Sequence, residues 1–90
     1  MMKLFKSVDE RFEELGFTKV DQNKYGAYYE KEVADYKYIH QIDILHKKSG
    51  KHIVISSQKD INKDGFSNAV GLTKPEVKLC IKKMKEMGFK

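Results

Sequence analysis

The 90-residue sequence has one cysteine, one proline and no tryptophan. Because Cys80 has no partner within the chain, an internal disulfide is excluded, which fits a reducing compartment. Long apolar runs are also missing: no stretch reaches the length needed to span a bilayer, and residues 1–6 lack the core of a signal peptide. We therefore expect a cytoplasmic protein that does not enter a membrane.

The length of the chain indicates the number of domains, and its charge indicates the kind of partner it could bind. We expect one domain over residues 1–90, since independent cores usually need ~50–200 residues. Residues 1–45 hold 7 Lys+Arg and 9 Asp+Glu, whereas residues 46–90 hold 11 and 4, so the two halves carry −2 and +7 of the net charge of +5. This asymmetry is typical of binding to an acidic partner, and also of lysine-rich solvated surfaces.

The segment 36–57 predicts two β-strands joined by a tight turn, because apolar and polar residues alternate along both halves. Two registers fit the turn. A two-residue loop would pair Ile44 with Ile55 and would separate apolar from polar residues most cleanly. A three-residue loop with Gly50 in a left-handed bulge would instead pair Ile44 with Val54. We favour the first register.

Two helices flank this hairpin, and each opens on a capping box and closes on a glycine. The first begins after Ser7 and ends at Gly16, and the second begins after Thr73 and ends at Gly88. The second helix has a predicted core stripe at helical spacing, formed by Val77, Cys80, Ile81, Met84 and Met87. Leu79 lies outside this stripe.

Residues 24–33 alternate like a half-buried strand, and the pattern also allows a short strand over residues 17–21. The predicted order is therefore α-β-β-β-α, with a short extra first strand as the variant. We expect an α+β domain whose antiparallel sheet carries both helices on one face and leaves the other face open. Residues 58–72 are predicted to form one long irregular segment.

Within that segment, Asp60, Asn62, Asp64 and Gly65 have the spacing that opens an EF-hand-type calcium loop. The twelfth position of such a loop carries a bidentate carboxylate, and here it is Gly71. Aspartate, asparagine and glycine also favour turns for their own conformational reasons. We therefore interpret the stretch as a turn.

The histidines suggest metal binding only if His46 and His52 face each other, which requires the three-residue loop. A zinc site takes three or four protein ligands, so a pair is insufficient, and we predict no metal site and no cofactor. Catalysis would need a nucleophile, a base and an orienting carboxylate in one cleft. His40 and Asp43 point to opposite faces, and the pattern identifies no base for Ser56. We predict that the protein is not an enzyme.

Two surfaces remain as candidate binding sites. On the last helix, lysines within about 80° of one another could follow the phosphates of a nucleic acid, although the row is equally typical of a solvated face. These residues are Lys74, Lys78, Lys82 and Lys85. On the open face of the sheet we expect apolar side chains that a protein partner would cover. These residues are Tyr28, Ile39, Leu45 and Val54.

The order helix, three strands and basic helix is similar to the double-stranded RNA-binding domain. The stretch Thr73-Lys74-Pro75-Glu76-Val77-Lys78 looks like the basic motif at the start of that family's second helix. Lys74 and Lys78 match two of its three phosphate-contacting lysines, and Pro75 stands at the third. The loop at Ala34–Asp35 departs from the family's Gly-Pro-x-His pattern.

A looser resemblance, over most of the chain, is to small phage and prophage proteins of Gram-positive bacteria. It rests on a capped helix ending like residues 14–17 and on a closing helix that begins like residues 72–77. The resemblance implies an accessory protein that binds another protein. Our leading hypothesis is accordingly a monomeric or homodimeric, non-enzymatic module that binds a protein through the open sheet face. The alternative is binding of duplex RNA or DNA through the lysine row.

Overall fold

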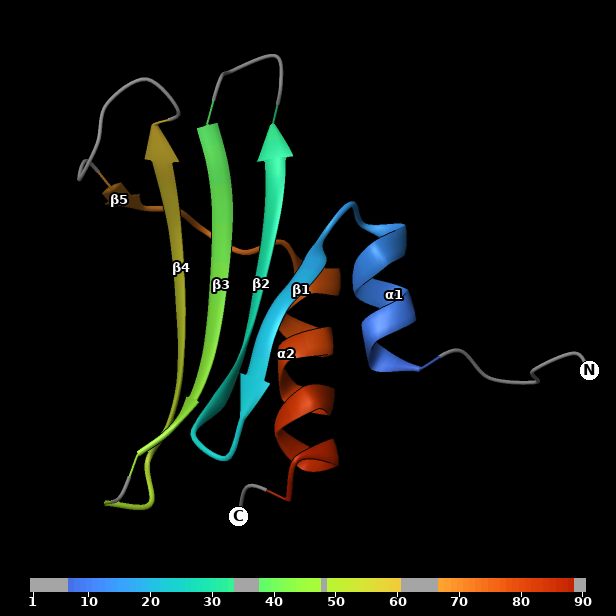
Figure 1. Cartoon of the computed structure of the whole chain (residues 1–90), viewed down its shortest axis with the longest axis vertical. Coiled ribbons are helices and arrows are strands. Elements are labelled where there is room, and N and C mark those ends of the chain that lie inside the picture. The colour runs from blue at the N-terminus through green and yellow to red at the C-terminus, as the bar shows by residue number, and fades with distance from the viewer. Residues whose placement is uncertain (1–6, 34–37, 48, 61–66, 89–90) are drawn as a thin grey trace, which may run out of the picture.

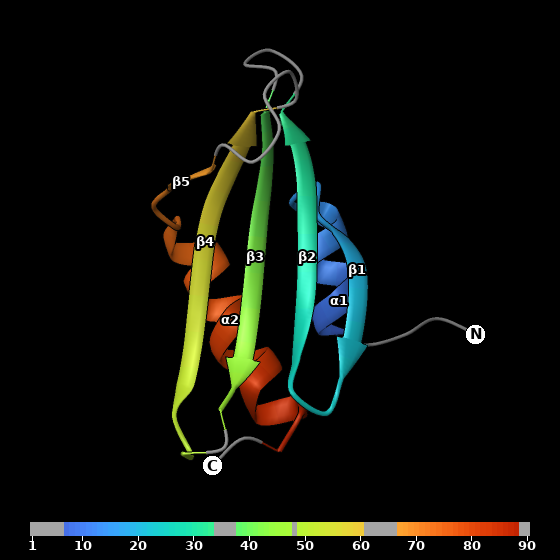
Figure 2. The same cartoon turned by 60° about the vertical axis from the view of Figure 1, so that its left-hand side comes forward.

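The computed structural model describes residues 7–33, 38–47, 49–60 and 67–88. In chain order the elements are α1 (Val8–Glu14), β1 (Thr18–Asn23), β2 (Gly26–Val33), β3 (Tyr38–His46), β4 (His52–Asp60), β5 (Ser67–Ala69) and α2 (Lys74–Glu86) (Figure 1). The sheet is antiparallel in the order β1-β2-β3-β4-β5, so each strand pairs with its neighbours in sequence. Both helices lie on the same side of it (Figure 2). The predicted α+β architecture is confirmed.

The ends of α1 follow from local sequence signals. Glu10 N–H donates to Ser7 Oγ at 3.1 Å, and Ser7 N–H donates to Glu10 Oε1 at 3.4 Å, which completes the predicted capping box. At the other end Gly16 adopts a φ of +93° and Phe17 N–H donates to Phe12 O at 2.9 Å. This Schellman ending turns the chain back, so that Phe17 packs against Phe12 in the core.

The buried face of α2 differs from the predicted stripe. Cys80, Met84 and Met87 pack in or against the core as expected, but Val77 and Ile81 are 41% and 47% exposed. Leu79 and Lys83 are buried in their place. The physical reason is that α2 contacts α1 as well as the sheet, so its buried arc is rotated toward α1. Apolar periodicity alone does not include a lysine in that arc.

The β3–β4 register is the one that we did not favour. Ile44 pairs with Val54, and His46 pairs with His52. Gly50 has a φ of +88°, and its N–H donates to Lys47 O at 2.9 Å. The left-handed glycine therefore sets the three-residue loop, and this turn preference outweighs the cleaner separation of apolar residues.

The sheet has two more strands, β1 and β5, than the three long strands predicted from the sequence. β1 is the short extra strand, and its pairing with β2 shifts between Lys19 and Asp21. The irregular segment expected over residues 58–72 is wrong in part, because β4 continues to Asp60 and β5 pairs with it. The calcium-type positions Asn62, Asp64 and Gly65, the connection at residues 34–35 and the end of the chain at Phe89 lie outside the described residues.

The core lies between the helices and the centre of the sheet. It consists of Phe12, Phe17, Ala27, Tyr29, Ile42, Ile44, Leu79 and Cys80. The rings of Phe12 and Tyr29 stack with centroids 4.1 Å apart, which joins α1 to β2. Gly26 allows a close approach of β3, since a Cβ there would lie 2.3 Å from Ile44 O.

Candidate functional site

The open face of the sheet carries an apolar patch interrupted by one carboxylate. Strand pairing places Asp43 on β3 between Tyr28 on β2 and Ile55 on β4, all on the side away from the helices. The adjacent row pairs Leu45 with Ile53 on the same side. An antiparallel sheet with one solvent-facing side usually alternates apolar inward and polar outward, so this outward apolar group is a binding candidate. We call these five residues the open-face patch.

Three of the four residues predicted for this face are found there: Tyr28, Ile39 and Leu45. The prediction of Val54 is wrong, because Val54 lies on the helix-covered side and packs against the core. The reason is the register, since moving β4 by one residue exchanges its two faces. Ile53 and Ile55 thereby reach the open face, and Ile55 is 44% exposed. The sequence signal for this register is Gly50, because a glycine in the turn favours the left-handed bulge that places Ile53 and Ile55 on the open face.

Asp43 is the electrostatically unusual member of the open-face patch. Burial between its two neighbours raises the pKa of the Asp43 carboxyl, because the charged form loses hydration. In the part of the chain that the structure describes, no lysine or arginine pairs with it. A hollow of about 370 Å³ beside Asp43 is lined by β1, β2 and β3, including Val20, Tyr28 and Gln41.

The charges around the open-face patch are mostly negative. The pairing pattern puts three further carboxylates on the same side of the sheet, and Lys59 is the one described lysine there. These carboxylates belong to Asp21, Glu30 and Glu32. Among the described residues, carboxylates therefore outnumber cations on the open side of the sheet, which favours a basic partner there.

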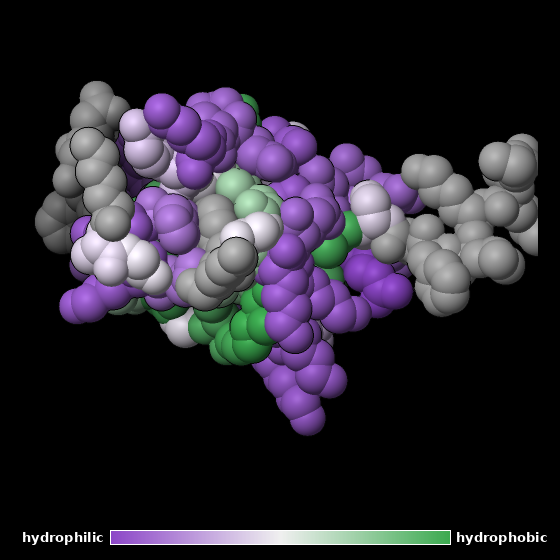
Figure 3. Space-filling view, turned by 90° about the horizontal axis from the view of Figure 1, so that it is seen from below, coloured by the Kyte–Doolittle hydropathy of each residue, from purple (hydrophilic) through white to green (hydrophobic). Residues whose placement is uncertain are grey.

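The predicted lysine row lies on the surface of α2 that faces away from the sheet. All four side chains, Lys74, Lys78, Lys82 and Lys85, are exposed. None of them forms an ion pair with another described residue. Lys78 and Lys82 line a hollow of about 260 Å³ between the helices, beside Arg11 and Glu14. Seen from below, hydrophilic side chains project next to a hydrophobic patch (Figure 3).

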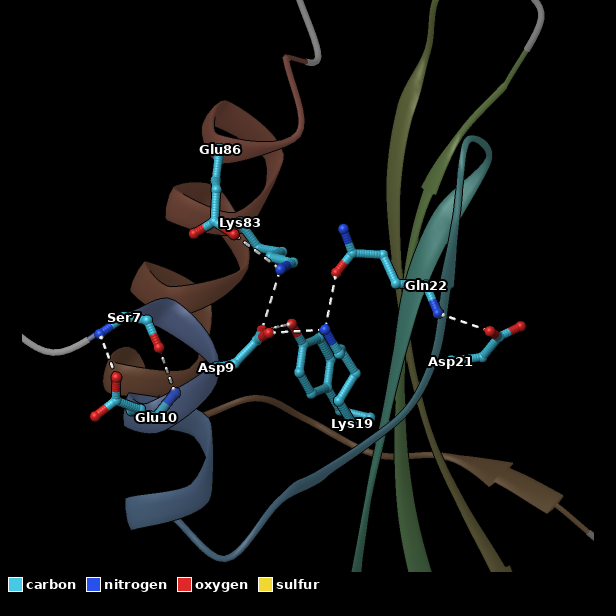
Figure 4. Close-up of polar contacts among 9 residues, drawn as sticks. Ser7, Asp9, Glu10, Lys19, Asp21, Gln22, Lys83 and Glu86 are labelled. Atoms are coloured by element: carbon cyan, nitrogen blue, oxygen red, sulfur yellow. Dashed lines mark hydrogen bonds and ion pairs between the residues drawn. The ribbon is translucent and has the colours of Figure 1, made fainter.

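A polar network joins both helices to the sheet, and local sequence patterns gave no sign of it (Figure 4). Asp9 Oδ1 accepts from Tyr29 OH at 2.5 Å and from Lys83 Nζ at 3.0 Å, while Asp9 Oδ2 accepts from Lys19 Nζ at 2.9 Å. Lys83 Nζ also donates to Glu86 Oε1 at 3.0 Å. Lys83 is 1% exposed, so this network neutralises a buried ammonium group and serves the packing of α2.

The structure gives Ser56 the neighbour that the sequence did not identify. His40 Nε2 lies 2.7 Å from Ser56 Oγ, on the helix-covered side of the sheet. Burial lowers the pKa of His40, and His40 borders a hollow of about 450 Å³ near the start of α2. Glu76 lines the same hollow, but its carboxylate accepts the Thr73 N–H at 2.8 Å in the helix cap. The Glu76 charge also opposes, in part, the lowering of the His40 pKa by burial. The arrangement thus gives the buried His40 a hydrogen-bond partner in Ser56 and a carboxylate nearby.

The remaining reactive groups are consistent with structural roles. Cys80 is buried, and burial raises the pKa of its thiol to about 11, which keeps it protonated and unreactive. Over residues 7–33, 38–47, 49–60 and 67–88, no three or more His, Cys, Asp or Glu side chains gather where they could hold one metal ion. His46 and His52 do face each other, as the three-residue loop requires.

Comparisons with known proteins add no family to this description. No family model matches the chain, and neither curated proteins nor solved structures gave a match. Neither of the two described helices is long and apolar enough to cross a membrane. The structure itself defines the class: an α+β domain with a sequentially ordered antiparallel sheet, one covered face and one open face.

Proposed function

We propose that the protein is a non-enzymatic interaction module that binds a basic protein surface through the open-face patch. The observation that carries this proposal is Asp43, a partly desolvated carboxylate between Tyr28 and Ile55 that has no cation beside it among the described residues. Holding a charged group in such surroundings is unfavourable in the free protein. A lysine or arginine from a partner would compensate the charge.

The neighbours of Asp43 provide the rest of a recognition surface. Burial of exposed apolar area contributes about 25 cal/mol per Å², and a charge pair inside such a patch is shielded from water. The surrounding carboxylates of Asp21, Glu30 and Glu32 would speed encounter with a basic partner. The partner chemistry is therefore a lysine or arginine flanked by apolar side chains.

Selection from a displayed library of random peptides tests this proposal. We expect enrichment of peptides with a basic residue next to apolar ones, and NMR shift changes at Tyr28, Asp43 and Ile55 on their binding. Asp43→Lys should weaken binding at least tenfold, because it places like charges together. Lys59→Gln, on the same face, is the matched control and should leave binding unchanged or slightly tighter. Acidic peptides, or shift changes confined to α2, would contradict the proposal.

A second candidate function is binding of duplex RNA or DNA through the lysine row. The observation that favours it is that all four ammonium groups are exposed and carry no ion pair to a described carboxylate. Two of the four, Lys74 and Lys78, also belong to the stretch that resembles the basic motif of the double-stranded RNA-binding domain. Each phosphate neutralised by a lysine should add about 0.9 to the slope of log affinity against log salt.

Fluorescence anisotropy with labelled duplex RNA and DNA at low salt separates this candidate from the first. The test variant changes Lys74, Lys78, Lys82 and Lys85 to Gln. The matched control changes four other exposed lysines, Lys24, Lys47, Lys51 and Lys59, to Gln and so has the same net charge. Loss of binding only in the test variant supports the candidate. Equal loss in both variants, or no binding by the wild type, rejects it.

A further inference from the structure

The hollow of about 450 Å³ near the start of α2 has the size of a small-molecule site. Its walls come from β2, β3, the segment after β5 and the first turn of α2, and they include Val33, His40, Val70 and Glu76. We call it the His40 hollow. Because His40 and Asp43 are three positions apart on β3, the His40 hollow and the open-face patch lie on opposite sides of the sheet.

Glu76 brings a nearly buried carboxylate to the His40 hollow. It is 7% exposed, and its Oε1 accepts the Thr73 N–H at 2.8 Å. Glu76 forms no ion pair with another described residue, and its Oε2 has no hydrogen-bond partner. Among the described residues that are not exposed, every side-chain oxygen sealed from solvent has such a partner. Glu76 Oε2 is therefore accessible to a small molecule.

His40 brings a second acceptor to the same place. It is 6% exposed, and its Nε2 lies 2.7 Å from Ser56 Oγ. Burial lowers the pKa of His40, which favours the neutral ring, and when Nε2 donates to Ser56 the other nitrogen carries a lone pair. This nitrogen, Nδ1, has no partner among the described residues and is not sealed from solvent. The charge of Glu76 acts on His40, so the two acceptors are near each other.

We propose that the His40 hollow binds a small organic amine, whose ammonium group donates to Glu76 Oε2 and His40 Nδ1. An ammonium group has donors and no acceptor, so it complements two acceptors without a donor between them. Val33 and Val70 provide apolar walls for the stem of the amine. These walls favour an organic cation over a metal ion, and the described residues do not gather three metal-ligating side chains.

The charges that border the His40 hollow also favour a cation. Glu32 and Glu76 are its two carboxylates, and Lys31 is its single ammonium group. Lys31 Nζ already donates to Leu15 O at 3.2 Å and lies 4.9 Å from the centroid of the Phe17 ring. Carboxylates therefore outnumber cations in the lining, and a ligand with a carboxylate or phosphate would meet more like charge than opposite charge.

Titration of the full chain with benzylamine, followed by NMR, tests the proposal. Benzyl alcohol has the same shape without the charge, and benzoate has the opposite charge. We expect saturable shift changes at Val33, His40 and Val70 with benzylamine, in the millimolar range of a small ligand, and no saturation with the other two compounds. No binding of benzylamine, or equal binding of benzyl alcohol, would overturn the proposal.

Glu76→Gln is the decisive variant, because glutamine also completes a capping box and so preserves the start of α2. It should weaken benzylamine binding at least about tenfold, since a charged hydrogen bond becomes a neutral one. Glu10→Gln makes the same change at the same position of the α1 cap and is the matched control that should leave binding unchanged. Equal affinity of Glu76→Gln and wild type would contradict the assignment.

His40→Phe tests the second acceptor, because it removes Nδ1 and keeps an aromatic ring beside Phe17. It should weaken benzylamine binding roughly threefold to tenfold, while circular dichroism confirms the fold. Unchanged binding would show that His40 is not part of the site. Shift changes centred on Asp43 would place the amine on the open-face patch and overturn this proposal, whereas failure to bind benzylamine at His40 leaves the proposed function untouched.

Discussion

At the scale of single residues, the dominant electrostatic feature is the carboxylate of Asp9. Burial by itself would raise the pKa of Asp9, but the hydrogen bonds from Tyr29, Lys19 and Lys83 outweigh it and lower the pKa to about 2. The pKa of Tyr29 is raised, first by burial and then by Asp9. The pair is thus a phenol that stays protonated beside a carboxylate that stays ionised.

The two partners in the Asp9–Lys83 ion pair should differ in their effect on stability. Asp9→Asn removes the central charge and leaves the buried ammonium of Lys83 with only the exposed Glu86, so we expect a loss of about 2–3 kcal/mol. Lys83→Met leaves Asp9 with Tyr29 and Lys19 and should cost about 1 kcal/mol or less. Urea unfolding measures both. A larger loss for Lys83→Met would contradict this account.

Acid stability should report the Asp9 network directly. Because the pKa in the folded state is lowered from 3.8 to about 2, the unfolded chain takes up the proton first as pH falls. The contribution is complete above pH ~4 and is lost progressively as pH falls through ~2. Asp9 is 29% exposed, so we expect the contribution to be about 1–2 kcal/mol. The difference in unfolding free energy between wild type and Asp9→Asn should shrink by this amount over the interval, and a constant difference would contradict the prediction.

At the scale of elements, the helix ends could be predicted from sequence and the helix faces could not. The capping box of α1 and the ending at Gly16 depend on residues within a few positions of one another. The buried arc of α2 depends on α1, and the Asp9–Lys83 contact joins residues 74 positions apart. The spacing of apolar residues along α2 does not show which of its residues contact α1. For this reason Leu79 was missed and Val77 was misplaced.

The rotated face of α2 has a measurable consequence. Leu79→Ala removes a side chain that is 6% exposed and should lower the free energy of unfolding by about 2–4 kcal/mol. Val77→Ala removes one that is 41% exposed and should cost less than about 1 kcal/mol. The sequence-based stripe predicts the reverse order. Chemical denaturation of the two variants shows which of the two assignments of the buried face of α2 is correct.

At the candidate binding site, too, the sequence predicted some residues of the open face correctly and others not. Alternation placed Tyr28, Ile39 and Leu45 on the open face, because a strand's two faces follow from its own sequence. Val54 was misplaced because the phase of β4 relative to β3 depends on the turn at Gly50. Asp43 was identified as a strand residue, but its role as a desolvated charge required both neighbouring strands to be in place.

At the scale of the whole molecule, the two candidate binding surfaces lie on opposite sides of the sheet and differ in the sign of their charge. Carboxylates surround the open-face patch, whereas the lysine row lies on the far side of α2. Association with a basic partner and with a nucleic acid should therefore respond to different substitutions. The quadruple glutamine variant of the lysine row should leave selection of basic peptides unchanged, as measured by titration calorimetry. A parallel loss of both activities would show that the two surfaces are not independent.

The strand order also bears on how fast the protein folds. Each strand pairs only with its neighbours in sequence, so the sheet closes through short loops, whereas docking of α2 on α1 joins the two ends of the described chain. The Asp9–Lys83 contact should then form after the transition state. Stopped-flow measurements on Asp9→Asn should show faster unfolding with a nearly unchanged refolding rate. The helix pair would thus govern the lifetime of the native state, and the sheet the rate at which that state is reached.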